Sequence, residues 1–309
     1  MEKGYDGLRK LRMGHRFEWT HHRHGWGFAT NLINRTYGSE RGTLFVNAVE
    51  DQLLYHGAVH EPWVGILHQV PKTTLQGFPD LERFLSMPAW LESKPHCLGL
   101  WTLCNYTRRY LLNAGIGVPV ESLPYPVPDE MPEFDWERFH ARTRPRLLHI
   151  GEFLRDYQAF FDLRVPEWDK QLLIPEDWSI KSPSLQLNDS VSLIDPVDNE
   201  TYDQMITESV VYVKLFDAPA NTLVVECLAT ATPICVNPVG GVIEYLGPQY
   251  PLYMIGDIAD LLKDEGRLKA THSYLKDRRQ DYVTPAKFHT ALTTSSIFAV
   301  LPCMNAKAE

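Results

Sequence analysis

The segment from residue 221 to residue 247 carries polar residues and glycines in an order that could hold a ligand. Asn221 or Thr222 can cap an apolar helix that runs to Ala231, and Glu226 lies one turn inside that helix. The free amides at a helix N-terminus attract phosphate. A carboxylate one turn further on can accept hydrogen bonds from two hydroxyls of a ribose. The alternative interpretation is an ordinary helix with one tolerated polar residue.

Two glycines follow the short strand that we expect at 234–237. Pro233 stops the preceding helix, and Pro238, Gly240 and Gly241 form the loop after the strand. Glycine lets a backbone approach a ligand closely, although a glycine pair after a strand is most often only a turn. In open α/β sheets ligands bind outside the carboxyl ends of the strands. The loop and the helix start are therefore expected at the same edge of a sheet.

Apolar runs that are short enough for buried strands alternate with helical periodicity along the chain. This alternation predicts an α/β protein with mostly parallel sheets. Asn105 or Thr107 is expected to cap the helix after the third strand, and Gly115 to end it. The expected strands lie at 43–48, 63–70, 98–104, 120–128, 146–151, 170–175, 190–195, 210–216 and 234–237.

A proline-rich stretch divides the strand pattern into two halves. Residues 124–145 carry five prolines and little periodicity, which is typical of a linker. We therefore expect two Rossmann-like domains, at residues 1–135 and 136–309. The final 25 or so residues could form a helix that crosses back to the first domain.

The composition narrows the classes of partner. The chain of 309 residues has a formal net charge of −9. This charge disfavours non-specific binding to nucleic acid and to anionic membranes. Five cysteines without a CxxC pair favour reduced thiols in a cytosol-like compartment. We expect no signal peptide and no membrane span, although peripheral membrane contact stays open.

The segment that starts at Asp217 resembles the nucleotide-sugar half of GT-B glycosyltransferases, particularly those of glycosyltransferase family 4. The resemblance implies two Rossmann-like domains whose parallel sheets face a central cleft. It also implies that Glu226 binds the ribose and that the amides near Asn221 and Thr222 meet the diphosphate. Ala218 departs from the family pattern, because a first glutamate usually stands there. The matching residues are Asp217, Asn221, Thr222, Glu226, Thr232, Pro233, Gly240, Gly241 and Glu244.

The same resemblance implies further site residues in both domains. Arg155, with Lys214 as a second candidate, would contact the donor diphosphate and neutralise its charge. Gly25 and Gly27 resemble the glycine loop that touches the donor phosphates or the acceptor. His68, at the end of a strand, would orient the acceptor hydroxyl or accept its proton. The structural alternatives are a surface ion pair of Arg155 with Asp156 or Glu152 and a purely structural His68, and His149 is expected to be a core residue.

A metal is not expected at any of these positions. The histidines of "HHRH" at 21–24 are too close together along the chain to converge on one ion. The first domain has no DxD near a strand end. We therefore predict no cofactor and no essential metal, as the resemblance also implies.

The resulting prediction is a cytoplasmic hexosyltransferase-like enzyme. It would move a sugar from a UDP- or GDP-sugar to a hydroxyl of a glycan, lipid-linked or protein-linked acceptor, as in polysaccharide biosynthesis. The family implies retention, with Asp217 near the sugar, and inversion with His68 as base stays open. One alternative is a catalytically silent GT-B module that binds a nucleotide sugar or a partner. Another is a DNA-modifying glycosyltransferase, which would need a basic face formed by Arg12, Arg16, Arg23, Arg35 and Arg41.

Overall fold

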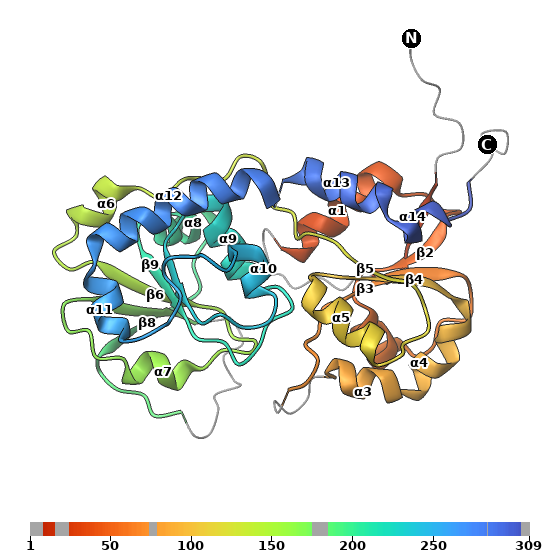
Figure 1. Ribbon diagram of the computed structural model, residues 1–309, viewed down its shortest axis with the longest axis horizontal. Coiled ribbons are helices and arrows are strands. Elements are labelled where there is room, and N and C mark those ends of the chain that lie inside the picture. Colours follow the sequence, from red (N-terminus) through yellow and green to blue (C-terminus); the bar gives the residue numbers. More distant parts are fainter. Residues whose placement is uncertain (1–8, 16–24, 74–78, 175–184, 283, 304–309) are drawn as a thin grey trace, which may run out of the picture. The chain divides into compact units, whose positions relative to one another are not determined.

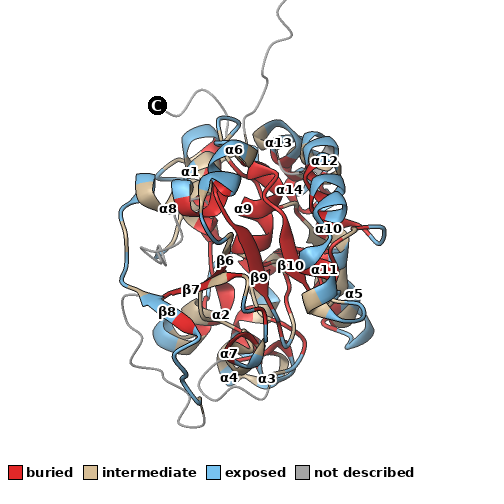
Figure 2. Cartoon of the chain, turned by 90° about the vertical axis from the view of Figure 1, so that its left-hand side faces the viewer, coloured by how far each residue is buried: buried red, intermediate tan, exposed pale blue. Residues whose placement is uncertain are grey.

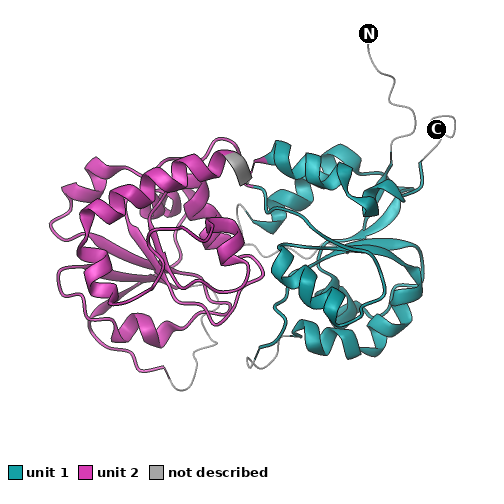
Figure 3. Cartoon of the chain, viewed as in Figure 1, with its two compact units in different colours: residues 1–126, 285–309 teal, residues 127–284 magenta. Residues whose placement is uncertain are grey.

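The chain forms two compact units, each built on its own parallel sheet. The computed structural model describes residues 9–15, 25–73, 79–174, 185–282 and 284–303. The first unit comprises residues 1–126 and 285–309, and the second comprises residues 127–284 (Figure 3). Each contains a five-stranded sheet in which every strand pair is parallel. The α/β class predicted from alternating apolar runs and helices is confirmed.

The first sheet follows the order of the chain, β1-β2-β3-β4-β5 (Figure 1). The sequence pattern does not indicate β1, because three residues are too few to show a period. It is nevertheless paired with β2 through Leu11 and Met13. The strands are β1 (Leu11–Met13), β2 (Thr43–Val46), β3 (Trp63–Leu67), β4 (Cys97–Thr102) and β5 (Val120–Ser122).

Helices cover both faces of the first sheet. In Figure 1, α1, α13 and α14 lie over one face, and α3, α4 and α5 lie over the other. Large buried aromatic side chains, including Trp63, Trp90 and Phe84, fill part of the core between them. The helices are α1 (Trp26–Tyr37), α2 (Val49–Asp51), η1 (Gln52–His56), α3 (Leu81–Ser86), α4 (Pro88–Ser93), η2 (Lys94–His96), α5 (Asn105–Asn113), α13 (Pro285–Thr294) and α14 (Ser296–Ala299).

The start of α5 differs from the prediction. The helix begins at Asn105, its N-cap is Cys104, and no side chain caps it. The hydroxyl of Thr107 donates instead to the carbonyl oxygen of Cys104 at 3.1 Å. Thr107 therefore lies inside the first turn rather than before it. The predicted end is confirmed, because Gly115 follows the helix with a φ of 69°.

The C-terminal residues pack against the first sheet. The indole Nε1 of Trp101, on β4, donates to the hydroxyl of Ser295 at 3.3 Å. Tyr37, on α1, lies 4.9 Å from Phe298, centroid to centroid. Ile297 is fully buried. Residues after 284 thus complete the core of the first unit, which explains the discontinuous division of the chain.

The second sheet has the order β10-β9-β6-β7-β8. The chain runs from β6 to β8 at one edge and then returns to β9 on the other side of β6. Figure 2 shows β6, β9 and β10 as largely buried. The carboxyl ends of β6 and β9 form the point at which strand order reverses, where open α/β sheets bind ligands. The strands are β6 (Arg146–Ile150), β7 (Asp169–Leu173), β8 (Val191–Ile194), β9 (Val210–Val213) and β10 (Ile234–Val236).

The charged segment after Asp257 forms two consecutive helices, α11 and α12. Asp257 caps the first by accepting from the amides of Ala259 and Asp260. Asp264 then interrupts the helix, and its carboxylate accepts from the amide of Arg267 at 2.9 Å. The helices of the second unit are α6 (Trp136–Ala141), α7 (Tyr157–Asp162), α8 (Asn199–Thr207), α9 (Thr222–Thr230), α10 (Val242–Leu246), α11 (Ile258–Lys263) and α12 (Glu265–Tyr282).

Residues 127–135 belong to the second unit rather than to the first. The amide of Phe134 donates to the carbonyl of Thr230 at 2.8 Å, and that of Asp135 to the carbonyl of Thr207 at 2.9 Å. Phe134 is also buried. The unit boundary therefore falls after residue 126, and not after residue 135, because these residues hydrogen-bond to distant parts of the second unit.

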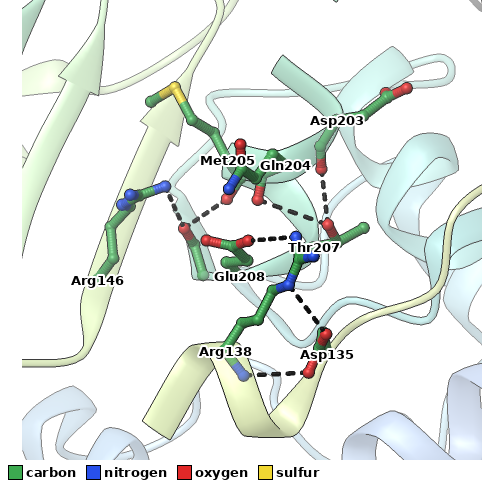
Figure 4. A network of polar contacts seen from close by, with 9 residues as sticks. Asp135, Arg138, Arg146, Asp203, Gln204, Met205, Thr207 and Glu208 are labelled. Atoms are coloured by element: carbon green, nitrogen blue, oxygen red, sulfur yellow. Dashed lines mark hydrogen bonds and ion pairs between the residues drawn. The ribbon is translucent and has the colours of Figure 1, made fainter. Parts of the chain in front are cut away.

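Charged side chains reinforce that attachment at the amino edge of the second sheet (Figure 4). Asp135 caps α6 and also pairs with Arg138 at 3.4 Å. Arg138 pairs in addition with Glu208, which precedes β9, at 3.1 Å. Arg146, at the start of β6, reaches the hydroxyl of Ser209 at 3.5 Å. This network lies at the edge of the sheet opposite to the switch point.

The contact between α14 and β4 allows a test of the first unit's architecture. A Cβ atom at Gly99 would lie 2.7 Å from Cγ1 of Ile297. We expect Gly99→Ala to lower the free energy of unfolding by about 1–3 kcal/mol because it overpacks this contact. Ile297→Ala alone is expected to cost about 2–5 kcal/mol.

The double variant is expected to cost less than the sum of the two single variants, because the smaller side chain at position 297 makes room for the new methyl group. Urea unfolding of the four proteins measures the coupling. Strict additivity would contradict the packing of α14 on β4.

Candidate functional site

The loops that follow β6 and β9 pair with each other at the switch point of the second sheet. Arg155 and Leu215 form an antiparallel bridge. The amide of Asp156 donates to the carbonyl of Lys214 at 2.8 Å, and that of Phe216 to the carbonyl of Leu154 at 2.9 Å. The two carboxyl ends are thus tied together, and the side chains that follow them are held in one place.

Arg155 is positioned by its neighbours on this edge. One guanidinium nitrogen donates to the carbonyl of Phe153 at 2.8 Å, and another to Oδ1 of Asn221 at 3.4 Å. Its Nε is buried and has no hydrogen-bond partner among the described residues. Gly151 leaves room for this side chain, since a Cβ atom there would lie 2.5 Å from the guanidinium. Burial lowers the pKa of Arg155. The nearby Tyr157, Tyr202 and Glu226 act in the opposite direction and raise it.

The surface ion pair considered for Arg155 is formed by another residue. Lys214, the second cationic candidate, pairs with Asp156 at 3.0 Å. Asp156 also caps α7 by accepting from the amide of Ala159 at 3.1 Å. Lys214 therefore has an acidic partner already, whereas Arg155 contacts carbonyl and amide oxygens. Of the two predicted cations, Arg155 is the better placed to receive an anion.

The predicted cap of α9 is confirmed. Oδ1 of Asn221 accepts from the amide of Val224 at 3.3 Å, and the helix begins at Thr222. The same Oδ1 atom also accepts a hydrogen bond from the guanidinium of Arg155. The N-terminus of α9 and Arg155 are thus joined through one side-chain oxygen. Both bring positive electrostatic potential to the carboxyl edge of the sheet.

Glu226 is buried, and a tyrosine holds one of its oxygens. The side chain is 3% exposed, and Oε2 accepts from the hydroxyl of Tyr202, on α8, at 2.7 Å. Burial raises the pKa of Tyr202, and Glu226 raises it further, so the phenol stays protonated as the donor. Sequence reasoning missed Tyr202, because no local pattern links it to a residue 24 positions away.

The loop with the two glycines packs against the segment after β9. The side-chain amide of Asn237, after β10, bonds both the amide and the carbonyl of Leu215, each at 2.8 Å. The amide of Gly241 donates to the carbonyl of Ala218 at 2.7 Å. Gly240 has a φ of 45°. The structure therefore brings this loop and the residues around Asp217 together, as the sequence indicated.

A second group of candidates lies at the carboxyl edge of the first sheet. Nε2 of His68, after β3, donates to the carbonyl of Asn47 at 2.8 Å. The indole Nε1 of Trp26 donates to the same carbonyl at 2.7 Å. The rings of Trp26 and His68 meet edge to face at 4.1 Å. Because a carbonyl only accepts, Nε2 of His68 carries the proton and Nδ1 is the basic nitrogen of the neutral ring.

The two predicted loop glycines differ in role. Gly25 is the N-cap of α1, without a side-chain cap, and it directly precedes Trp26. Gly27 lies inside the first turn of α1 rather than in a loop, so the predicted glycine loop is wrong at this position. The helix starts earlier because Trp26 is anchored in the core by Asn47. Gly25, but not Gly27, therefore directly precedes the group that Trp26, Asn47 and His68 form.

Other residues singled out by the sequence lie outside these groups. His149 is buried in β6 beside Tyr157 and Phe160, and burial lowers its pKa to about 3, with Arg155 adding to the shift. The predicted core role of His149 is confirmed. Arg12 pairs with Glu61 at 2.6 Å. Arg16, Arg23 and the histidines at 21–24 lie outside the described residues.

Neither a metal cluster nor a membrane helix appears in the part of the chain that the structure describes. No three His, Cys, Asp or Glu residues there are grouped so that they could hold a metal ion. None of the described helices combines the length and the apolar character that crossing a bilayer requires.

Comparisons with solved structures identify the fold. Sucrose-phosphate synthase from Thermosynechococcus elongatus superposes with a TM-score of 0.61 and 15% identity, over 88% of this chain and 75% of that one. Anabaena HepE, solved with UDP-glucose, superposes with a TM-score of 0.65 and 10% identity, over 92% of this chain and 97% of the HepE chain. TarM superposes with a TM-score of 0.62 and 11% identity, over 88% of this chain and 58% of the TarM chain.

These identities are low, so the likeness shows the fold alone. No protein-family model matches the chain, and no curated protein matches it in sequence. The chain has the fold of the GT-B glycosyltransferases, which confirms the predicted fold class.

The double role of Asn221 gives a prediction about stability. Asn221→Ala removes the cap of α9 and a partner of Arg155, and we expect it to lower the free energy of unfolding by about 1–2 kcal/mol. Asn221→Asp keeps a cap oxygen and adds a negative charge beside Arg155, so we expect it to be as stable as the wild type at pH 7. Urea unfolding measures both. Equal destabilisation by the two variants would contradict the capping role.

Proposed function

We propose that the chain is a glycosyltransferase that binds a nucleoside diphosphate sugar at the switch point of its second sheet. The observation that carries the proposal is the convergence of Arg155, the N-terminus of α9 and buried Glu226 at the carboxyl ends of β6 and β9. An open parallel sheet binds ligands at this point. Two cationic features beside a buried carboxylate suit a ligand with both phosphates and vicinal hydroxyls.

Each group has a distinct role in this proposal. The diphosphate lies at the N-terminus of α9, where Arg155 supplies the positive charge that stabilises the departing nucleoside diphosphate. Glu226 accepts from the ribose hydroxyls while Tyr202 holds its Oε2 atom. The backbone of Gly240 and Gly241 approaches the nucleotide. No essential metal is required, because a positively charged side chain already faces the leaving group.

UDP-glucose is the first donor to test. HepE was solved with UDP-glucose and also with UDP and glucose. A TarM variant was solved with UDP and a GlcNAc-glycerol. The family 4 resemblance of the segment from Asp217 to Glu244 agrees with these donors. A hydroxyl of a glycan or glycoconjugate is the proposed acceptor, with His68 beside it and retention as the expected outcome.

A silent binding module is the second candidate. Ala218 is buried and has no acidic group at the position where the resembled family has a glutamate. Such a module would bind the same nucleotide at the same residues but would not turn it over. The two candidates therefore differ in turnover and not in binding.

Thermal unfolding with nucleotides tests the binding site. The ligands are UDP, GDP, dTDP, ADP and CMP, each with and without Mg²⁺ or Mn²⁺. A nucleotide at 100 times its dissociation constant adds roughly 2.7 kcal/mol to the folded state. We expect one nucleoside diphosphate to raise the melting temperature without metal, and Glu226→Gln to lose that shift.

Glu208→Gln is the matched control for this test. Glu208 is a glutamate of the same unit that is likewise buried and held by one partner, Arg138, but it precedes β9 at the opposite edge of the sheet. It is expected to keep the full ligand shift. A loss of the shift in both variants, or in neither, would contradict the assignment of Glu226.

The phosphate role of Arg155 has its own test. Arg155→Gln removes a charged donor. We expect it to weaken the binding of UDP by about 1.5–3 kcal/mol and to change the affinity for uridine little. Calorimetric titration compares the two ligands. Arg146→Gln, at the other end of β6, serves as control and is expected to bind UDP like the wild type. Equal losses for UDP and uridine would argue against a phosphate contact.

Release of UDP from UDP-glucose then separates the two candidate functions. An enzyme releases UDP slowly to water and faster with an accepted hydroxyl compound. Binding of UDP-glucose without any release, across simple sugars, glycerol and lipid-linked acceptors, would favour the silent module.

A further inference from the structure

Glu50, which the sequence analysis did not single out, is a buried carboxyl at the carboxyl edge of the first sheet. It is 1% exposed. Its Oε1 atom accepts from the backbone amides of His68 at 2.7 Å and of Gln69 at 2.8 Å. Its Oε2 atom is buried and has no hydrogen-bond partner among the described residues. A carboxyl in this setting needs an explanation, because burying an uncompensated charge is costly.

The fold brings Glu50 to this place through a close helix-to-strand contact. Glu50 lies on α2, directly after β2, and β2 pairs with β3. Val49 packs on Gly65 of β3 so closely that a Cβ atom at that glycine would collide with it. This approach lets the carboxyl of Glu50 reach the amides that follow the end of β3. Those amides belong to His68 and its neighbour.

The surroundings favour the neutral carboxyl. No ion pair involves Glu50 among the described residues. The pKa of Glu50 is raised to about 8, mainly by burial and to a smaller extent by the charge of Asp51 on the same helix. The amides of His68 and Gln69 act in the opposite direction but are outweighed. At neutral pH the protonated form therefore predominates. His68 and Gln69, which follow the neighbouring strand β3, meet Glu50 through their backbone amides.

His68 is consequently held at both its backbone and its ring. Glu50 fixes the backbone amide, and the carbonyl of Asn47 fixes Nε2 of the ring. Trp26 holds that carbonyl from the other side. The contact with Asn47 selects the tautomer whose basic nitrogen is Nδ1.

We propose that Glu50, in its neutral form, is a positioning residue that fixes the backbone of His68 and Gln69 at the end of β3. The part that His68 plays in sugar transfer rests on the proposed function, but the hold of Glu50 on His68 does not. The test therefore needs no nucleotide and no acceptor.

The experiment is an NMR titration of the full-length protein from pH 5 to pH 9.5. The amide signals of His68 and Gln69 are followed in the wild type and in Glu50→Gln, which keeps the accepting oxygen but cannot ionise. We expect a transition with a midpoint about 8 in the wild type that is absent from the variant. The comparison isolates the carboxyl, because the two proteins differ only at residue 50.

The ring signals of His68 report the tautomer in the same samples. We expect the Nε2–H form in both proteins, because both keep the contact with Asn47. A carboxyl transition near 4.5 or no difference between the two titrations would overturn the proposal. A failure of the protein to bind UDP at the second sheet would overturn the proposed function. It would leave the expected signals of His68 and Gln69 unchanged.

Stability against pH gives an independent readout. The pKa of Glu50 is raised in the folded state, so its contribution is complete below about pH 4.5 and is lost as the pH rises towards 8. The melting temperature of Glu50→Gln relative to the wild type is expected to rise between pH 5 and pH 8 and then level off. A constant difference over this range would contradict a buried neutral carboxyl.

Discussion

The reversal of strand order between β6 and β9 is the constraint on which the candidate donor site depends. Because the chain leaves β6 towards one edge and returns on its other side, the connections after β6 and β9 run in opposite directions and a gap opens between the two carboxyl ends. The bridge between Arg155 and Leu215 closes that gap with backbone instead of side chains. Arg155 comes from the loop after β6, whereas Asn221 and Glu226 both belong to α9, Asn221 as its N-cap and Glu226 one turn inside it.

Buried polar groups lie at the carboxyl edge of the sheet in both units. In the second unit these are Arg155, whose Nε has no described hydrogen-bond partner, and Glu226, held by Tyr202. In the first unit the corresponding group is Glu50. Burying such groups costs free energy unless they are fully paired. Buried polar atoms without a described partner also occur at the amino edge, where Nε of Arg146 is one, so the carboxyl-edge groups are set apart by their convergence and not by burial alone.

Local chemistry explains which features the sequence predicts well. Apolar runs predict the buried strands, and Asn221 and Glu226 are recognisable because cap, helix and break follow within a dozen residues. The prediction is weaker where partners are distant in sequence. Tyr202 reaches Glu226 across 24 positions, and Glu50 reaches His68 across 18.

The incorrect local predictions have related causes. Gly27 looks like part of a glycine loop, yet α1 starts before it because the core anchors Trp26 through Asn47. Thr107 looks like a cap, yet its hydroxyl bonds back to Cys104 inside the first turn. The linker ends early because Phe134 and Asp135 bond to residues far along the chain. For Gly27 and the linker, tertiary contacts override the local preference, whereas for Thr107 the competing contact is itself local.

A crystal structure of the protein with UDP is the most direct test of the central claim. We expect the ribose hydroxyls within hydrogen-bond distance of Glu226, and the diphosphate in contact with Arg155 and the amides at the start of α9. A nucleotide bound away from the carboxyl ends of β6 and β9, or bound there with its ribose turned away from Glu226, would contradict it.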